Sequence, residues 1–278
     1  MPAPDVVVLN RDSRRIPEVP SDSIALVVTS PPYPMIPQWD ALFSRLGAEN
    51  FGSMHGLLES VWQECYRTLL PGGLLAINIG DALRSRADDG FRLWPNHAEV
   101  LRRCAGIGFR PLPYVLWKKP MNRPNAFLGS GFLPPNAYVT VDCEFILLFR
   151  KGGLRRFPRK DASRRQSVYR KEERDRWFSQ VWEVRASRQD GEAGRRTAAF
   201  PPEIPRRLIR MFSVEGDTVL DPFAGTGTTL RVARELRRRA VGVEIETELA
   251  ERLRREFTAP EPNGDAGGVR PRRTGSAG

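Results

Sequence analysis

Short apolar runs alternate with longer segments of helical periodicity along most of the chain. Runs such as 24–28 and 74–79 are continuous aliphatic stretches, which is typical of strands buried on both faces. Segment 51–70 instead spaces its apolar residues at helical intervals and ends in a Pro-Gly-Gly stop. The pattern predicts strands at 6–9, 24–28, 74–79, 114–117, 144–149, 218–220 and 240–243, and helices at 51–70, 97–105, 202–212, 228–239 and 248–257. This alternation predicts an α/β fold, with a mostly parallel or mixed sheet and helices on both faces.

One segment does not follow this alternation. Residues 150–189 are highly charged and have little periodicity, yet they contain Tyr169, Trp177, Phe178 and Trp182. Because disordered segments are usually poor in aromatic residues, we interpret this stretch as an inserted recognition element. The predicted organisation is a first half-domain at 5–149, an insert at 150–196, a second half of the same domain at 197–257, and a disordered tail at 258–278 that is rich in Pro, Gly and Arg.

The composition is that of an ordinary soluble globular protein. The chain has 278 residues, of which 40% are hydrophobic and 28% are charged. No apolar stretch approaches the roughly 20 residues that span a bilayer, and the first residues do not resemble a signal peptide. The three cysteines, Cys65, Cys104 and Cys143, are isolated, which fits a reducing, cytoplasmic location. Neither they nor the two histidines have the spacing of metal ligands, so we expect no metal site and no membrane segment.

The positive charge of the chain is concentrated in one stretch. The net charge is +11, and residues 150–176 alone carry twelve Lys and Arg against four Asp and Glu. Such a cluster is typical of a surface that binds nucleic-acid phosphates, although a solvated loop without a partner is the alternative. The predicted DNA contacts are Arg155, Arg156, Arg159, Lys160, Arg164 and Arg165.

A polar and aromatic turn follows the buried strand 24–28. Residues 29–33 have the sequence Thr-Ser-Pro-Pro-Tyr. Neither proline can donate a hydrogen bond to a neighbouring strand, so the strand must end there. The turn therefore presents a serine hydroxyl, free carbonyls and a tyrosine ring at the carboxyl edge of the sheet, where open α/β folds bind their ligands.

A second motif combines a strand, a glycine turn and the start of a helix. Residues 221–229 have the sequence Asp-Pro-Phe-Ala-Gly-Thr-Gly-Thr-Thr. The glycines allow a sharp turn and a close approach to a ligand, and no Gly-Lys pair follows, so the motif is not a Walker loop. Glu244 ends the next predicted strand about 20 residues later, where a carboxylate can accept hydrogen bonds from both hydroxyls of a ribose.

Together the two motifs resemble those of the permuted, β-class DNA amino-methyltransferases over roughly residues 5–257. In that family the catalytic tetrad, here Ser30-Pro31-Pro32-Tyr33, precedes the recognition region, and the S-adenosylmethionine (AdoMet) loop follows it. The resemblance implies a circularly permuted, Rossmann-like AdoMet-methyltransferase sheet with a small basic recognition insert. It implies cofactor contacts from Asp12, Thr29, Phe200, Pro201, Asp221, Pro222, Phe223, Gly225, Thr226, Gly227, Thr228, Thr229 and Glu244. Arg196 stands where the family usually has a histidine, so that histidine's role is not carried over.

The resemblance also implies a reaction. The Ser30 hydroxyl and the Pro31 carbonyl are suited to hold the two N–H bonds of an exocyclic amine, and Tyr33 is suited to stack on a base flipped out of the duplex. In the family, Ser-Pro-Pro-Tyr is associated mainly with the N4 amine of cytosine and Asp-Pro-Pro-Tyr mainly with the N6 amine of adenine. Cytosine C5 methylation requires a cysteine after a proline, and no cysteine here has that context.

Several alternatives stay open at this point. The first expectation is site-specific N4-cytosine methylation of double-stranded DNA in restriction–modification, with a cognate restriction endonuclease as partner. Adenine N6 methylation, amino-methylation of RNA and a non-catalytic DNA-binding module that retains AdoMet are the alternatives. A homodimer is consistent with the resemblance, because dimers are common in the family. Trp39 either shapes the pocket for the flipped base or fills the site that the base vacates, in contact with DNA, or is a packed loop aromatic.

Overall fold

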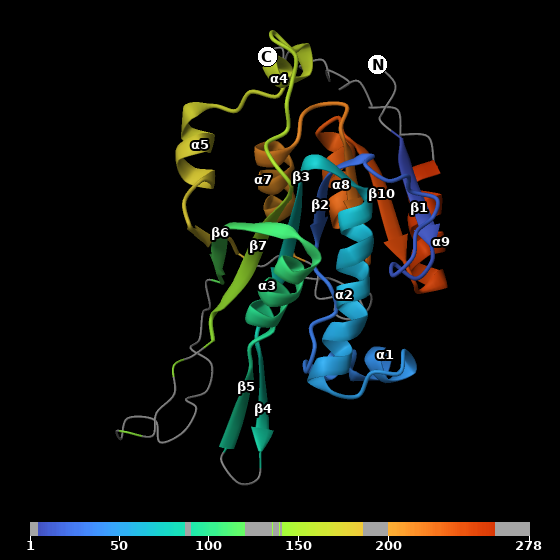
Figure 1. The fold of residues 1–278 in the computed structure, drawn as a ribbon, viewed down its shortest axis with the longest axis vertical. Helices are drawn as coiled ribbons and strands as arrows, with labels where there is room; N and C mark the ends of the chain where they lie inside the picture. Colours follow the sequence, from blue (N-terminus) through green and yellow to red (C-terminus); the bar gives the residue numbers. More distant parts are fainter. Residues whose placement is uncertain are drawn as a thin grey trace, which may run out of the picture.

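The fold is built around a single large sheet (Figure 1). The computed structural model describes residues 5–86, 90–119, 135, 139, 141–185 and 200–258. The strands are β1 (Val6–Asn10), β2 (Ile24–Thr29), β3 (Leu69–Ile79), β4 (Ala82–Arg86), β5 (Gly90–Trp94), β6 (Phe109–Lys118), β7 (Cys143–Lys151), β8 (Val181–Glu183), β9 (Thr218–Asp221) and β10 (Arg239–Glu244). The helices are η1 (Pro37–Trp39), α1 (Asp40–Arg45), α2 (Phe51–Thr68), α3 (Asn96–Ile107), α4 (Ala162–Gln166), α5 (Lys171–Trp177), α7 (Glu203–Phe212), α8 (Thr228–Glu235) and α9 (Thr247–Thr258).

Within the described residues, eight strands form the main sheet in the order β1-β10-β9-β2-β3-β7-β6-β8. The first five of these run parallel, and β7 is antiparallel to both of its neighbours. Strands β4 and β5 form a separate antiparallel pair. The predicted α/β class, with a mostly parallel sheet, is confirmed.

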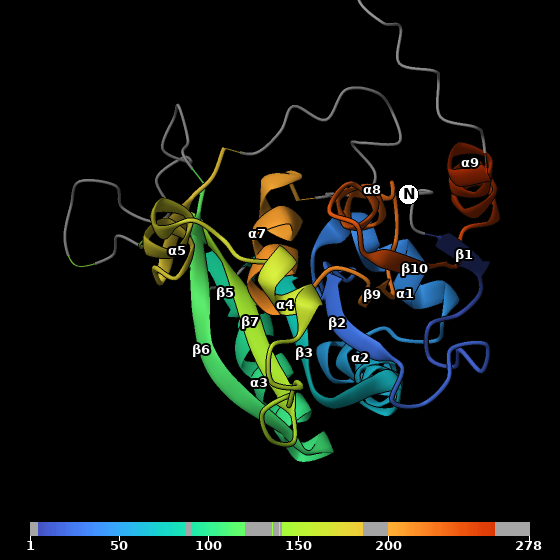
Figure 2. The same ribbon diagram turned by 90° about the horizontal axis from the view of Figure 1, so that it is seen from above.

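Helices cover both faces of the sheet, as the alternation predicted (Figure 2). On one face, α7, α8 and α9 bury their apolar sides against residues such as Leu26 and Val219. On the other face, α2 and α3 pack over residues such as Val27 and Leu220. Neighbouring residues of one strand therefore belong to opposite cores. This explains why residues 24–28 of β2 and residues 219–220 of β9 are all apolar.

The chain leaves β2 and β9 in opposite directions across the sheet. From β2 it continues through α2 to β3 on one side, and from β9 it continues through α8 to β10 on the other side. Divergence of this kind opens a crevice at the carboxyl ends of the two strands, where doubly wound folds bind their ligands. Both sequence motifs begin at that crevice.

Several predicted boundaries differ from the structure, and the strand predicted at 74–79 already begins at Leu69 in β3. The helix predicted at 228–239 ends at Glu235, because Arg237 adopts a left-handed φ of 60° and Arg239 already begins β10. The helix predicted at 51–70 ends at Thr68, since Leu69 is in an extended conformation. The strand predicted at 114–117 is the inner part of the longer β6. The elements η1, α1, β4, β5, α4, α5 and β8 were not predicted.

The segment predicted as an insert is partly built into the main sheet. Its first residues complete β7, and β8 pairs in parallel with β6. Trp182 is 1% exposed and belongs to the core of the α7 face. Arg196 and the predicted tail beyond residue 258 lie outside the described residues. Among the helices that are described, none is both long and apolar enough to cross a bilayer.

Candidate functional site

Pairing of β2 with β9 brings the two sequence motifs together. Leu26 and Val27 lie opposite Val219 and Leu220 in register, so the residues that end the two strands become neighbours. The Thr29 hydroxyl donates a 2.7 Å hydrogen bond to Asp221 Oδ1, although the two residues are 192 positions apart in the sequence. Both groups are buried.

A hollow opens next to this contact. Its volume is about 310 Å³, and one side is open to solvent. Its lining combines both motifs with the segment ahead of α7, and consists of Ser30, Phe200, Asp221, Phe223, Ala224, Gly225, Thr226, Thr228 and Thr229. Eight of these nine residues were predicted as catalytic or cofactor contacts from the sequence.

The glycine turn is shaped by two residues with positive φ. Gly225 has a φ of 51° and Gly227 a φ of 86°. A Cβ added at Gly227 would lie 2.5 Å from Leu253 Cδ2, so a side chain there would require the buried Leu253 side chain of α9 to move. Gly227 also precedes the first residue of α8, so this turn directs the helix N-terminus toward the hollow.

Two carboxylates stand at the ends of neighbouring strands. Glu244 accepts one backbone N–H on each oxygen, from Gly225 at 2.8 Å and from Glu246 at 2.9 Å. Each oxygen therefore keeps a lone pair for a ligand. Burial raises the pKa of Glu244 and raises the pKa of Asp221 to about 6, with hydrogen bonds from Thr29 and from the Phe223 amide partly offsetting the effect at Asp221.

The loop after β1 packs against the same turn. Ser13 Oγ donates a hydrogen bond to the carbonyl of Pro222, and the Arg11 amide donates to the carbonyl of Glu244. Asp12, the predicted adenosine contact, is partly exposed and accepts 2.9 Å hydrogen bonds from the amide and the side chain of Arg14. The structure thus places Asp12 beside the AdoMet motif, while its predicted ligand contact stays a prediction.

The tetrad Ser30-Pro31-Pro32-Tyr33 forms a partly buried turn whose two polar side chains meet. Ser30 Oγ lies 3.1 Å from the Tyr33 hydroxyl. That hydroxyl also lies 3.0 Å from Glu144 Oε2, and Asn78 Nδ2 lies 2.7 Å from both oxygens. Lys119 forms an ion pair with the other oxygen of Glu144. Burial, reinforced by the Glu144 charge, raises the pKa of the Tyr33 phenol well above its ordinary value, so this phenol remains protonated.

Sequence reasoning did not identify Asn78, Lys119 or Glu144 as site residues. They lie at the ends of three different strands, β3, β6 and β7, which meet only in the folded sheet. The available signal was weak: Glu144 is an acidic residue directly before the apolar run 145–149 of β7. Gly80 makes room for this group, because a Cβ there would lie 3.1 Å from a ring carbon of Tyr33 and 3.3 Å from Glu144 Cγ.

Trp39 lies in η1, shortly after the tetrad. It is half-buried and packs against the small apolar cluster of Phe43, Ala48 and Met54. This packing corresponds to the packed loop aromatic that the sequence left open as an alternative.

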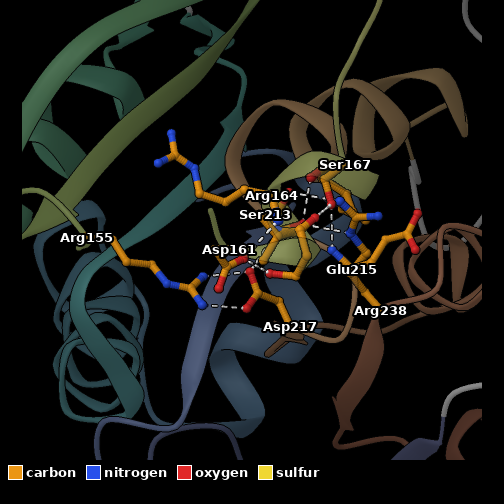
Figure 3. A network of polar contacts seen from close by, with 11 residues as sticks. Arg155, Asp161, Arg164, Ser167, Ser213, Glu215, Asp217 and Arg238 are labelled. Carbon is orange, nitrogen blue, oxygen red and sulfur yellow. Dashed lines mark hydrogen bonds and ion pairs between the residues drawn. The ribbon is translucent and has the colours of Figure 1, made fainter. Parts of the chain in front are cut away.

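The predicted basic contacts lie at the other edge of the sheet. β7 runs antiparallel to β3, so residues 152–168 follow it at the amino edge of the parallel strands, and α4 lies at the end of the molecule opposite α1 (Figure 1). Arg155 forms two hydrogen bonds, of 2.6 and 2.7 Å, with the carboxylate of Asp217 (Figure 3). The other five predicted contacts are exposed. The structure therefore does not bring these six side chains together with Ser30.

Comparison with known proteins identifies the family. The chain matches the model of the N6/N4 DNA methylase family over residues 24–255. It belongs to that family. The type II methyltransferase M.MjaI of Methanocaldococcus jannaschii is 54% identical over 262 residues, with 86% of each chain covered. M.MthZI of Methanothermobacter thermautotrophicus is 44% identical over 255 residues, with 85% of this chain and 72% of the relative covered.

Solved structures agree with this assignment. A putative DNA modification methylase from Thermus thermophilus, complexed with S-adenosyl-L-methionine, is 37% identical and aligns with a TM-score of 0.70 over 91% of this chain and 96% of its own. The PvuII cytosine-N4-specific DNA methyltransferase shares the fold at 19% identity and a TM-score of 0.62, over 94% of this chain and 90% of its own. The chain is thus an AdoMet-dependent DNA methyltransferase.

The residues in and beside the hollow fit this cofactor. The Glu244 carboxylate has lone pairs free for the ribose hydroxyls, and the nearby carboxylate of Asp221 favours a cationic sulfonium by its charge. Phe200 is buried at the wall of the hollow and offers an apolar surface to the rest of the ligand.

Proposed function

We propose that this DNA methyltransferase modifies the exocyclic N4 amine of a cytosine within a specific duplex site, as the modification activity of a restriction–modification system. The observation that carries the proposal is the neutral Ser30 hydroxyl at the edge of the AdoMet hollow. In the resemblance drawn from the sequence, a serine at this position is associated with cytosine N4 and an aspartate with adenine N6. A serine hydroxyl is also uncharged, whereas an aspartate would place a carboxylate beside the target amine.

The chemical problem is that the exocyclic amine is a poor nucleophile, because its lone pair is conjugated with the ring. Two acceptors that hold its N–H bonds favour a pyramidal nitrogen and direct the lone pair toward the methyl donor. The Ser30 hydroxyl and the Pro31 carbonyl are the proposed acceptors. Their contribution is positioning and electrostatic stabilisation, without a covalent intermediate.

Cofactor and base are held by different parts of the site. AdoMet supplies an electrophilic methyl group when it is bound. Glu244, Asp221, Phe200 and the 225–229 turn are the proposed cofactor contacts. Tyr33 is the proposed stacking surface for the base, which must leave the duplex to reach the site, and stacking of this kind contributes about 1–3 kcal/mol.

Nucleoside analysis of the product tests the target base. Unmethylated plasmid DNA would be incubated with the protein and AdoMet, digested to nucleosides and analysed by liquid chromatography and mass spectrometry, with standards that separate N4-methyl- from 5-methyldeoxycytidine. We expect N4-methyldeoxycytidine with the wild-type protein and none with Ser30→Ala. N6-methyldeoxyadenosine would overturn the cytosine assignment.

The same assay separates the remaining alternatives. Methylated ribonucleosides from added RNA, without modified DNA, would identify an RNA enzyme. Binding of AdoMet and DNA with no methylated product would identify a non-catalytic module. Sequencing that maps modified bases in a host expressing the chain would define the recognition site, and resistance of that DNA to a restriction endonuclease of the same specificity would support the restriction–modification role.

A further inference from the structure

We propose that Glu144 is a positioning residue for methyl transfer, which acts through Tyr33 to turn the Ser30 hydroxyl into an acceptor for the target amine. This inference rests on the proposed function in one respect, namely that Ser30 holds an N–H bond of that amine. It does not depend on whether the base is cytosine or adenine. Glu144 contacts the tetrad through Tyr33 and does not line the hollow.

The partners of the Tyr33 hydroxyl, together with its single proton, determine the direction of each hydrogen bond. Its three partners are Ser30 Oγ at 3.1 Å, Glu144 Oε2 at 3.0 Å and Asn78 Nδ2 at 2.7 Å. A phenol has one proton to donate and can accept two hydrogen bonds. A carboxylate can only accept, so Tyr33 donates to Glu144 and accepts from Asn78. Ser30 must then donate its proton to Tyr33.

The orientation of Asn78 is determined by the same carboxylate. Asn78 is 2% exposed, and its Nδ2 lies 2.7 Å from Glu144 Oε2 as well as 2.7 Å from the Tyr33 hydroxyl. Rotating the amide by half a turn would place its carbonyl oxygen against a carboxylate oxygen, which is repulsive. Asn78 is therefore a donor to both groups. Lys119 engages Oε1 of Glu144, which leaves Oε2 for Tyr33 and Asn78.

The direction of the Ser30–Tyr33 hydrogen bond determines what Ser30 offers to the target amine. Because the Ser30 proton is directed at Tyr33, the lone pairs of Ser30 Oγ are left for the N–H bond of the amine. If Tyr33 instead donated to Ser30, the Ser30 proton would be free to point at the amine, where donor would face donor. Glu144 excludes that arrangement before the base arrives, which is the preorganisation that catalysis by positioned dipoles requires.

Glu144→Gln is the most informative substitution, because Lys119 determines the orientation of the glutamine amide. The Lys119 ammonium requires an oxygen, so the glutamine NH₂ would face Tyr33 and donate to it. Tyr33 then loses the carboxylate that takes its proton, and Asn78 must turn because its Nδ2 would face the glutamine NH₂. The protons of Tyr33 and Ser30 therefore lose their fixed directions, although the shape of the side chain at position 144 is unchanged. Glu64→Gln is the matched control: the Glu64 side chain is 13% exposed and ion-paired to Arg67, and that of Glu144 is 14% exposed and ion-paired to Lys119.

The experiment measures single-turnover transfer of the tritiated methyl group from AdoMet to unmethylated plasmid DNA, together with the Kd of AdoMet. We expect Glu144→Gln to slow transfer by about 10- to 100-fold, comparable to the lower end of the loss of one preorganised group, with the AdoMet Kd changed less than about twofold. Glu64→Gln should leave both quantities within about twofold. A Glu144→Gln rate within twofold of wild type would overturn the proposal.

A double-mutant cycle separates this role from a merely structural one. Tyr33→Phe removes the shared hydroxyl, so Glu144→Gln should slow transfer by less than about threefold more in that background. Rate losses that multiply in the double variant would contradict action through Tyr33. If Glu144→Gln did not fold, Tyr33→Phe would test the same link: it should slow transfer about tenfold or more with an unchanged AdoMet Kd, and an unaffected rate would refute the proposal.

Failure of this inference differs from failure of the proposed function. A Ser30→Ala variant that still methylates DNA would refute Ser30 as the amine acceptor, and with it both proposals. An inactive Ser30→Ala variant beside a fully active Glu144→Gln variant would refute only the role of Glu144.

Discussion

At the scale of single residues, the site is dominated by buried polar groups that are paired across strands. Asp221 is 4% exposed, and it accepts hydrogen bonds from the Thr29 hydroxyl at 2.7 Å and the Phe223 amide at 3.1 Å. No cation pairs with it among the described residues. Burial without a countercharge disfavours the carboxylate, which is why its pKa rises to about 6. Asp221 therefore lowers the free energy of unfolding, and it places a negative charge at the cofactor site.

The first prediction concerns the pH dependence of that cost. The pKa of Asp221 is raised from 3.8 in the unfolded chain to about 6 in the fold, so the folded state binds the proton more tightly and the unfolding free energy falls as pH rises between these values. Asp221→Asn keeps an acceptor oxygen and removes the charge. We expect it to stabilise the cofactor-free protein by up to about 3 kcal/mol at pH 8, and much less at pH 4.

Urea denaturation of both proteins at the two pH values measures this difference. Equal unfolding free energies of the variant and the wild type at pH 8 would contradict the claim that burial of the charged Asp221 carboxylate destabilises the fold. AdoMet binding should weaken in the variant, since the charge opposite the sulfonium is lost.

At the scale of elements, the cofactor turn depends on close packing between α8 and α9. Gly227 has a φ of 86°, and a Cβ there would meet Leu253 of α9 at 2.5 Å. The glycine therefore serves the backbone conformation and the helix packing at the same time. Sequence patterns show a glycine turn of this kind directly, but they do not show which helix packs against it.

The second prediction compares two Gly→Ala substitutions. Gly227→Ala should destabilise the protein by about 1–3 kcal/mol and weaken AdoMet binding, because both the φ and the space are unfavourable for a side chain. Gly106→Ala in α3 is the control: nothing lies within 4 Å of its added Cβ, so the substitution should stabilise by about 0.5–1 kcal/mol. Thermal unfolding and calorimetric AdoMet titration measure both effects. A Gly227→Ala variant as stable as the wild type would contradict the prediction, because it would show that Leu253 of α9 moves aside at little cost in free energy.

At the scale of the whole molecule, the acceptor and cofactor site and the basic stretch lie at opposite edges of the sheet, although the sequence assigned both to DNA methylation. The acceptor and cofactor motifs lie at the carboxyl edge of the parallel strands, whereas the basic stretch that follows β7 lies at the amino edge. Arg155 joins this stretch to Asp217, which directly precedes β9. The Gly72 turn also packs against the Arg155 backbone, since a Cβ at Gly72 would lie 2.4 Å from its nitrogen.

The third prediction separates the structural arginine from the exposed ones. Replacing Arg156, Arg159, Lys160, Arg164 and Arg165 by glutamine should reduce the salt dependence of DNA binding, by about 0.9 in the log–log slope for each charge that contacts a phosphate. The rate of methyl transfer at saturating DNA should stay unchanged, because these residues are remote from Ser30. Filter binding across a salt series measures the slope. An unaltered slope would mean that this surface does not contact DNA.

Arg155→Gln is the control for that series. It should lower the unfolding free energy, because it leaves the Asp217 carboxylate, whose side chain is 8% exposed, without its guanidinium partner. The salt slope should be that of the wild type, since Arg155 is engaged within the protein.

The two motifs, the alternation of strands and helices, and hence the α/β class could all be inferred from the amino-acid sequence alone. These features are local: consecutive prolines end a strand, and closely spaced glycines form a turn, whatever the rest of the chain does. Tertiary structure alone decided that Thr29 meets Asp221, that Glu144 reaches Tyr33, and that the basic stretch lies at the far edge. Those contacts depend on strand order and direction, which follow from how the helices cover both faces of the sheet and leave no local pattern in the sequence.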